Sequence, residues 1–137
     1  MGRAKVILLI EGKQRDEVLV LSALQKCKIV NDVVVARDGA RAHEYLFGRY
    51  ETELPQVVML DPKQLDGLGF LRKLRTDQRT RQLPIVVFTT SSEEEAELGA
   101  HKLEPISFVR KPVEVEQFFE ATRRLGLSQQ VEGASGE

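Results

Sequence analysis

The stretch VVMLD, residues 57–61, is the segment that decides the fold. Four apolar residues follow one another without interruption and end in a carboxylate, Asp61, which Pro62 follows. An unbroken apolar run of this length is typical of a β-strand that is covered on both faces, as in a parallel sheet. Open parallel sheets bind and react at the carboxyl ends of their strands, so Asp61 is the first candidate for a reactive group. The same residues also fit a plain strand end, because Asp and Pro commonly terminate strands.

Similar apolar runs recur on both sides of this stretch, and helical patterns separate them. We expect strands at residues 4–10, 30–37, 57–61, 85–88 and 106–109. Helical spacing predicts helices at residues 14–27, 40–47, 68–76, 92–103 and 115–125. In the first helix Val18, Leu21 and Leu24, with Val20 and Cys27 beside them, recur at helical spacing and are expected to face the sheet. Ser91 or Ser92, with Glu94 or Glu95, fits a capping box that starts the fourth helix.

This alternation predicts an α/β fold, a flavodoxin-like doubly wound (βα)5 domain with a five-stranded parallel sheet. With right-handed crossovers and the strand order 2-1-3-4-5, four strand ends meet beside the topological switch point. They carry Glu11, Asp61, Thr89 and Lys111. Two acids, a hydroxyl and an ammonium in one place are more informative than any one of them. Taken singly, Lys111 also fits a solvated rim charge and Thr89 a strand-end hydroxyl.

The composition is that of one ordinary globular domain. The chain has 137 residues, 42% of them hydrophobic, which is enough for a single core. We expect the domain to span residues 1–126 and the small, polar residues 127–137 to form a flexible tail. A net charge of −1 gives no reason to expect nucleic acid or an anionic membrane as a partner. One cysteine, Cys27, excludes an internal disulfide, and the lack of a signal peptide or membrane span predicts a cytoplasmic location.

Six segments of the chain together match the pattern of a known family: VILLIEG, VVVARDGA, VVMLD, LDGLGFLRKLR, LPIVVFTTS and FVRKPV. By their order and nearly by their spacing, residues 4 to 126 resemble the receiver domain of bacterial two-component response regulators. The flanking segments VARDGARAHEYLFG, RTRQLPIVVFTTSSEEE and VRKPVEVEQF are similar to those of small regulators that are paired with phytochrome-type histidine kinases.

This resemblance implies a phosphorelay switch without enzymatic output. Asp61 would accept a phosphoryl group from a sensor histidine kinase, here one of the bacteriophytochrome class. Lys111 and Thr89 would contact the phosphoryl group, and Thr89 with Phe108 would form the switch. The resemblance also implies a cis peptide bond before Pro112, Mg²⁺ at the acidic pocket, and a homodimer through the face of the fourth helix, fifth strand and fifth helix. The first helix would dock on the kinase.

Three departures from the family pattern bear on this chemistry. Gly12 stands where the family has a second acid that helps to hold Mg²⁺, which leaves Glu11 and Asp61 as the predicted ligands. The loop after Asp61 is about two residues shorter than usual, and Pro62 lacks an amide proton. Glu104 stands where a glycine usually ends a helix. These departures favour impaired phosphorylation, or as an alternative a pseudo-receiver that binds proteins independently of phosphorylation.

Two other classes with a similar architecture fit less well. A phosphatase of the haloacid dehalogenase type needs a second Asp two residues after the first, and that position holds Lys63. A flavin or nucleotide binder needs a phosphate loop after the first strand, and EGKQRD is not one.

Overall fold

The computed structural model describes residues 5–48, 53–64, 66–127 and 129. Its strands are β1 (Ile7–Ile10), β2 (Val33–Ala36), β3 (Val57–Leu60), β4 (Ile85–Thr89) and β5 (Ile106–Arg110). Its α-helices are α1 (Gln14–Lys26), α2 (Gly39–Phe47), α3 (Gly67–Thr76), α4 (Ser92–Gly99) and α5 (Val115–Thr122). A single 3₁₀ turn, η1 (Pro62–Gln64), follows β3. It was not expected from the sequence.

The five strands form one parallel sheet in the order β2-β1-β3-β4-β5, which confirms the predicted flavodoxin-like fold. In β1 and β3, Ile10 pairs with Leu60, so the residues that follow them, Glu11 and Asp61, leave the sheet side by side. Thr89 pairs with Arg110 at the ends of β4 and β5. The register therefore brings four strand ends to one edge of the sheet.

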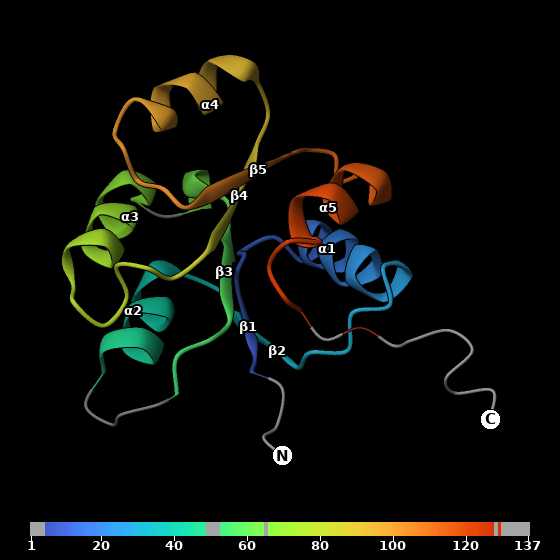
Figure 1. Cartoon of the computed structure of the whole chain (residues 1–137), viewed down its shortest axis with the longest axis horizontal. Helices are drawn as coiled ribbons and strands as arrows, with labels where there is room; N and C mark the ends of the chain where they lie inside the picture. The colour runs from blue at the N-terminus through green and yellow to red at the C-terminus, as the bar shows by residue number, and fades with distance from the viewer. Residues whose placement is uncertain (1–4, 49–52, 65, 128, 130–137) are drawn as a thin grey trace.

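Helices cover both faces of the sheet, α1 and α5 on one side and α2, α3 and α4 on the other (Figure 1). Successive strand residues point to opposite faces. In β1, Ile7 and Leu9 pack with α1 and α5, while Leu8 and Ile10 pack with α2 and α3. All residues of β3 are fully buried. This explains why its sequence is continuously apolar rather than alternating.

The buried face of α1 agrees with the predicted one at Val20, Leu24 and Cys27 and differs at Val18. Val20, Ala23 and Leu24 are buried, but the side chain of Val18 is 55% exposed and that of Leu19 is 39% exposed. The prediction was wrong for Val18, because the helix places positions 20, 23 and 24 on the sheet. The burial of Ala23 agrees with this orientation of the helix, but its small side chain contributes little to the hydrophobic pattern of the sequence.

The later helices are shorter than predicted. The helix predicted to reach Leu103 ends at Gly99, and the chain then takes a positive φ of 57° at Lys102. Leu103 is buried, and its carbonyl oxygen accepts a hydrogen bond of 2.7 Å from Arg75 Nε. Glu104 therefore lies beyond the helix and does not stand at its end, contrary to the prediction. Similarly, α5 ends at Thr122, three residues before the predicted end.

The chain after α5 turns back toward the first helix. Leu127 packs against the core on the α1 and α5 side, and Gln129 forms an antiparallel bridge with Ile29. The side-chain amide of Gln129 also donates to the carbonyl of Cys27 at 3.0 Å. Residues 128 and 130–137 of the predicted tail lie outside the described part of the chain, and the domain boundary at residue 126 stays a prediction. Within the described ranges, every helix is too short or too polar to cross a membrane.

Candidate functional site

Three of the four predicted strand-end residues meet at one ammonium. Lys111 Nζ lies 2.7 Å from Asp61 Oδ2 and 3.2 Å from Glu11 Oε2. These side chains come from the ends of β5, β3 and β1, and all three are nearly or fully buried. Lys111 Nζ also lies 5.9 Å from the centre of the Phe88 ring. The peptide bond between Lys111 and Pro112 is cis.

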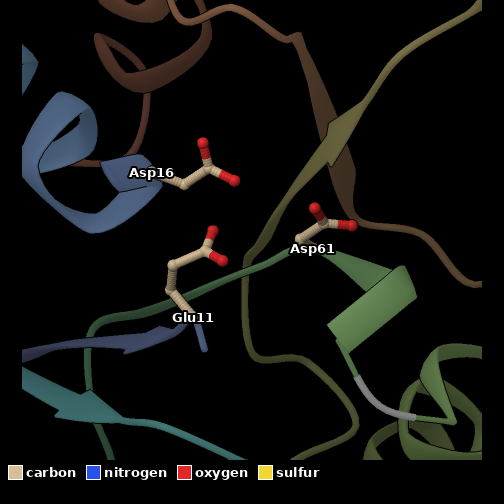
Figure 2. Close-up of side chains that lie close together, drawn as sticks. All are labelled: Glu11, Asp16 and Asp61. Carbon is tan, nitrogen blue, oxygen red and sulfur yellow. The ribbon is translucent and has the colours of Figure 1, made fainter. Parts of the chain in front are cut away.

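A third carboxylate, which the sequence reading missed, completes this cluster. Asp16 lies in the first turn of α1, and its Oδ2 is 2.8 Å from Lys111 Nζ. Figure 2 shows the carboxylates of Glu11, Asp16 and Asp61 gathered at the end of the sheet, although they come from three different elements. One oxygen from each of them lies within 4.8 Å of the others. We call these three residues with Lys111 the acidic cluster.

A signal for Asp16 was present in the sequence. It stands five residues after Glu11, in the first turn of the helix that follows β1. The first turn of such a helix lies above the carboxyl end of its strand, where ligands bind in this architecture. An acid in a first turn is also favoured by the helix dipole alone, so its position did not by itself indicate a site. Gly12, at the family's usual position, offers no side chain.

The charges of the acidic cluster influence one another strongly. Burial lowers the pKa of the Lys111 ammonium, but hydrogen bonds to Asp16 and Asp61 and the nearby carboxylates raise it more, so the net shift is upward. Lys111 is therefore charged at neutral pH. Burial raises the pKa of the Glu11 carboxyl, and the ion pair with Lys111 offsets only part of this effect. When all three carboxylates are ionised, the single ammonium does not balance them, and the acidic cluster carries a net negative charge.

The loop after Asp61 places a backbone amide on the Asp61 carboxylate, although Pro62 itself has none. The backbone nitrogen of Lys63 donates to Asp61 Oδ1 at 2.9 Å, within the turn η1. The short loop is closely packed, because a Cβ atom built on Gly67 would lie 2.4 Å from Pro62 Cβ and 2.5 Å from Pro62 Cα. The two oxygens of Asp61 therefore have separate partners, the Lys63 amide on Oδ1 and the Lys111 ammonium on Oδ2.

Thr89 is buried at the end of β4, and its hydroxyl is engaged with α4. Thr89 Oγ1 donates a hydrogen bond of 2.7 Å to Glu95 Oε2, and Glu95 Oε2 also accepts a hydrogen bond of 3.0 Å from Arg110 Nε. Ser91 is the N-cap of α4, and its hydroxyl accepts from the amide of Glu94 at 3.1 Å. Of the four predicted strand-end residues, Thr89 thus has its contact outside the acidic cluster.

The neighbouring residue Thr90 is tied to the loop after Asp61. Lys63 Nζ lies 2.8 Å from Glu94 Oε2 and 3.0 Å from Thr90 Oγ1, and so connects that loop to the start of α4. Phe108, the predicted switch residue, pairs with Val87 in the sheet and packs, partly buried, against the core on the α2, α3 and α4 side. None of these side chains belongs to the acidic cluster.

The donor set of the acidic cluster fits a hard divalent cation. Mg²⁺ prefers oxygen ligands, and it usually takes one or two protein carboxylates together with water and phosphate oxygens. Glu11, Asp16 and Asp61 offer carboxylate oxygens at short mutual distances. Together with a nucleophilic carboxylate and a buried ammonium, this arrangement is suited to reactions in which negative charge builds up on phosphoryl oxygens.

Comparisons with known proteins match the chain to one protein family. The family model of the response regulator receiver domain matches residues 7–123. The response regulator Rcp1 of Synechocystis sp. (strain PCC 6803) is 31% identical over 121 residues, which are 84% of this chain and 82% of Rcp1.

Among solved structures, the bacteriophytochrome response regulator RtBRR is 38% identical with a TM-score of 0.85, covering 96% of this chain and 83% of that one. The bacteriophytochrome response regulator AtBRR is also 38% identical, with a TM-score of 0.81, covering 96% of this chain and 99% of that one.

Proposed function

Because the chain belongs to the response regulator receiver domain family, we propose that Asp61 accepts a phosphoryl group from a phosphohistidine of a sensor histidine kinase. The similarity to bacteriophytochrome response regulators supports a kinase of the phytochrome type. The observation that carries the proposal is the contact of Lys111 Nζ with Asp61 Oδ2 at 2.7 Å inside a cluster of carboxylates.

In the proposed reaction a carboxylate oxygen of Asp61 attacks the phosphorus atom. The new O–P bond forms while the P–N bond breaks, and the electron pair of that bond stays on the imidazole nitrogen, which takes up a proton from solvent. Such a transfer needs little covalent chemistry from the protein beyond positioning and charge stabilisation. The Lys63 amide and the Lys111 ammonium hold the two oxygens of Asp61, and so fix the direction of the carboxylate.

The charge of the acidic cluster supports a role for a bound cation. A phosphoryl group brings further negative charge to a place where three carboxylates face one ammonium. The response regulator Rcp1, a relative of this chain, has been crystallised in a Mn²⁺-bound form. Here Glu11, Asp16 and Asp61 would hold the ion, which when bound supplies positive charge to the phosphoryl oxygens. Asp16 would then take the role that the family pattern gives to the residue at Gly12.

Lys111 and Thr89 would then contact the phosphoryl group. The Lys111 ammonium already lies beside the acceptor oxygen and balances the charge that spreads over the transferred group. Thr89 would donate its hydroxyl to a phosphoryl oxygen, and its movement would be passed on to Phe108 in the adjacent strand. The output would be a change in protein contacts.

Two surfaces are proposed for protein partners. Val18 and Leu19 leave apolar side chains exposed on α1, the helix expected to dock on the kinase. Homodimerisation through the face of α4, β5 and α5 stays a prediction. Sedimentation of the phosphorylated and unphosphorylated protein would test it.

A relative adds support for phosphorylation. The cyanobacterial phytochrome response regulator RcpA has been crystallised in phosphorylated form, and it is 26% identical with a TM-score of 0.71. The alternative of a pseudo-receiver was motivated by Gly12 and by the short loop after Asp61. Asp16 supplies a carboxylate and Lys63 an amide at these two places, so the geometry does not favour that alternative.

The test is phosphorylation by a small donor with a P–N bond, phosphoramidate, in the presence of Mg²⁺. We expect intact-mass analysis to show the gain of one phosphoryl group, and expect hydroxylamine to remove it, as an acyl phosphate requires. The gain should be absent in Asp61→Asn. The control is Asp66→Asn, because Asp66 caps α3 and Asn keeps that capping bond. A mass gain that persists without Asp61, or no gain in the native chain, would overturn the proposal.

A further inference from the structure

The switch hydroxyl has a partner in this chain before any phosphoryl group arrives. Thr89 Oγ1 donates to Glu95 Oε2 at 2.7 Å, a short bond of the kind that a hydroxyl makes with a charged acceptor. Thr89 is 1% exposed, so solvent offers its hydroxyl little competition. Glu95 lies only six positions along the chain, in the first half of α4.

The direction of this bond is set by the charge of Glu95. A hydrogen bond from Arg110 and a second from Thr89 lower the pKa of the Glu95 carboxyl below its ordinary value of 4.5. An ionised carboxylate can only accept, and a hydroxyl has a single proton to donate. While the Thr89 hydroxyl donates to Glu95, it cannot donate to a phosphoryl oxygen on Asp61.

We infer that Glu95 is a positioning residue that competes with the phosphorylated site for the hydroxyl proton of Thr89. The inference rests on the proposed function, because it needs a phosphoryl group on Asp61 as the second acceptor. Glu95 thereby stabilises the unphosphorylated conformation. The free energy of breaking the bond between Thr89 and Glu95 offsets part of the free energy gained when Thr89 contacts the phosphoryl group.

Arg110 holds the competitor in place. Its Nε bonds the same oxygen of Glu95 at 3.0 Å, and its backbone pairs with that of Thr89 across β4 and β5. The exchange at Thr89 therefore changes a junction of β4, α4 and β5. Arg110→Gln should act in the same direction as loss of Glu95, but more weakly, since Glu95 keeps its bond to Thr89.

A simpler role must be separated from this one. Glu95 could merely stabilise the start of α4, where acids are favoured by the helix dipole. The matched control is Glu97→Ala, which removes the same charge from the same helix at an exposed position. Circular dichroism and urea unfolding of both variants verify that each is folded.

The test measures binding of beryllofluoride, a phosphoryl mimic that forms on an Asp carboxylate, by calorimetry and fluorine NMR at constant Mg²⁺. We expect Glu95→Ala to bind it roughly threefold to tenfold more tightly than the native chain, because Thr89 no longer has to leave a charged acceptor. Glu97→Ala should bind like the native chain. Mg²⁺ binding without beryllofluoride should be the same in all three.

A double-mutant cycle with Thr89→Ala isolates the route through the hydroxyl. The effect of Glu95→Ala should disappear in the Thr89→Ala background. If the effect persists there, or if Glu97→Ala shows it equally, Glu95 acts through general electrostatics and the inference is wrong.

The same measurements distinguish a failure of this inference from a failure of the proposed function. Binding by the native chain that depends on Asp61, with no difference between the Glu95 and Glu97 variants, removes this inference and leaves the proposed function standing. If the native chain shows no binding that depends on Asp61, the proposed function fails and this inference fails with it.

Discussion

Lys111 and Asp16 are 95 residues apart in the chain, and their charged groups lie 2.8 Å apart at the end of the sheet. The same ammonium contacts Asp61 and Glu11, so Asp16 belongs to the surroundings of the proposed phosphorylation site. Gly12 left the family's second acidic position without a ligand, and a residue one helical turn further along provides a carboxylate instead.

The first prediction concerns Asp16 as a metal ligand. Asp16→Asn should weaken Mg²⁺ binding at least about tenfold, measured by calorimetry, because it removes a charged oxygen donor from a site with three. Glu17→Gln is the control, since Glu17 is on the same helix and pairs with Arg37 outside the acidic cluster.

A rescue sharpens this prediction. Gly126 is the glycine with a positive φ among the described residues, so a side chain at Gly12 needs no unusual backbone conformation. Adding Gly12→Asp to Asp16→Asn should restore much of the affinity. Unchanged Mg²⁺ binding in the single variant would show that Asp16 serves only to pair with Lys111.

The second prediction concerns the competition between Lys111 and the metal. Lys111→Met should lower the free energy of unfolding by about 1–3 kcal/mol without Mg²⁺, because three close carboxylates lose their partner. Added Mg²⁺ should stabilise this variant more than the native chain, since it binds carboxylates that Lys111 no longer occupies. Urea unfolding with and without Mg²⁺ measures both effects, and equal stabilisation of the two proteins would contradict the shared site.

The third prediction concerns the close packing of the loop after Asp61. Gly67→Ala should destabilise the protein by about 1–3 kcal/mol, because the new methyl group meets the backbone of Pro62. The shift of Pro62 would also disturb the Lys63 amide that holds Asp61. Gly99→Ala is the control, because a Cβ at Gly99 meets no atom within 4 Å. Urea unfolding measures the stability of both variants, and equal stability of Gly67→Ala and Gly99→Ala would argue against close packing of this loop.

The fourth prediction is a pH dependence that arises from Glu95. Hydrogen bonds from Arg110 and Thr89 lower the pKa of this carboxyl on folding. Its charge therefore adds stability above the ordinary value of pH 4.5, and this contribution is lost as the pH falls through the lowered pKa. Unfolding free energies of the native chain and Glu95→Gln should differ at pH 7 and converge in acid. High salt should reduce the difference at pH 7, because both partners are partly exposed. A difference that stays constant with pH would show that charge is not involved.

The fifth prediction concerns the exposed apolar side chains of α1. Val18→Glu should leave the unfolding free energy within about 0.5 kcal/mol of the native value, because Val18 is 55% exposed. Phosphorylation by phosphoramidate should not change, whereas transfer from a phytochrome-type histidine kinase should slow about tenfold. Equal slowing with both donors would place the defect in the site rather than in the contact with the kinase.

Local patterns were enough to predict the order of the elements and most residues of the proposed site. Continuous apolar runs identified the buried strands. Glu11, Asp61 and Lys111 directly follow such runs, and they were predicted as site residues because parallel strands place their carboxyl ends at one edge of the sheet. The ends of the helices and strands were harder to predict. The end of α4 depends on Lys102 and on the burial of Leu103, and long-range packing decides both.

The sequence by itself determined the doubly wound fold and the strand ends that meet, because hydrophobic periodicity is a local property and parallel pairing leaves few topologies. Only the tertiary structure decided which further side chains reach that place. The contact of Asp16 with Lys111 depends on the rotation of α1 against the sheet, and the contact of Glu95 with Thr89 depends on how α4 leaves β4. The amide of Lys63 reaches Asp61 because the chain makes a 3₁₀ turn there. The contact of Asp16 with Lys111 joins elements that are 95 residues apart. The contacts of Glu95 and Lys63 are short in sequence, but they depend on how α4 and the turn η1 are oriented against the sheet, which the residue pattern alone does not encode.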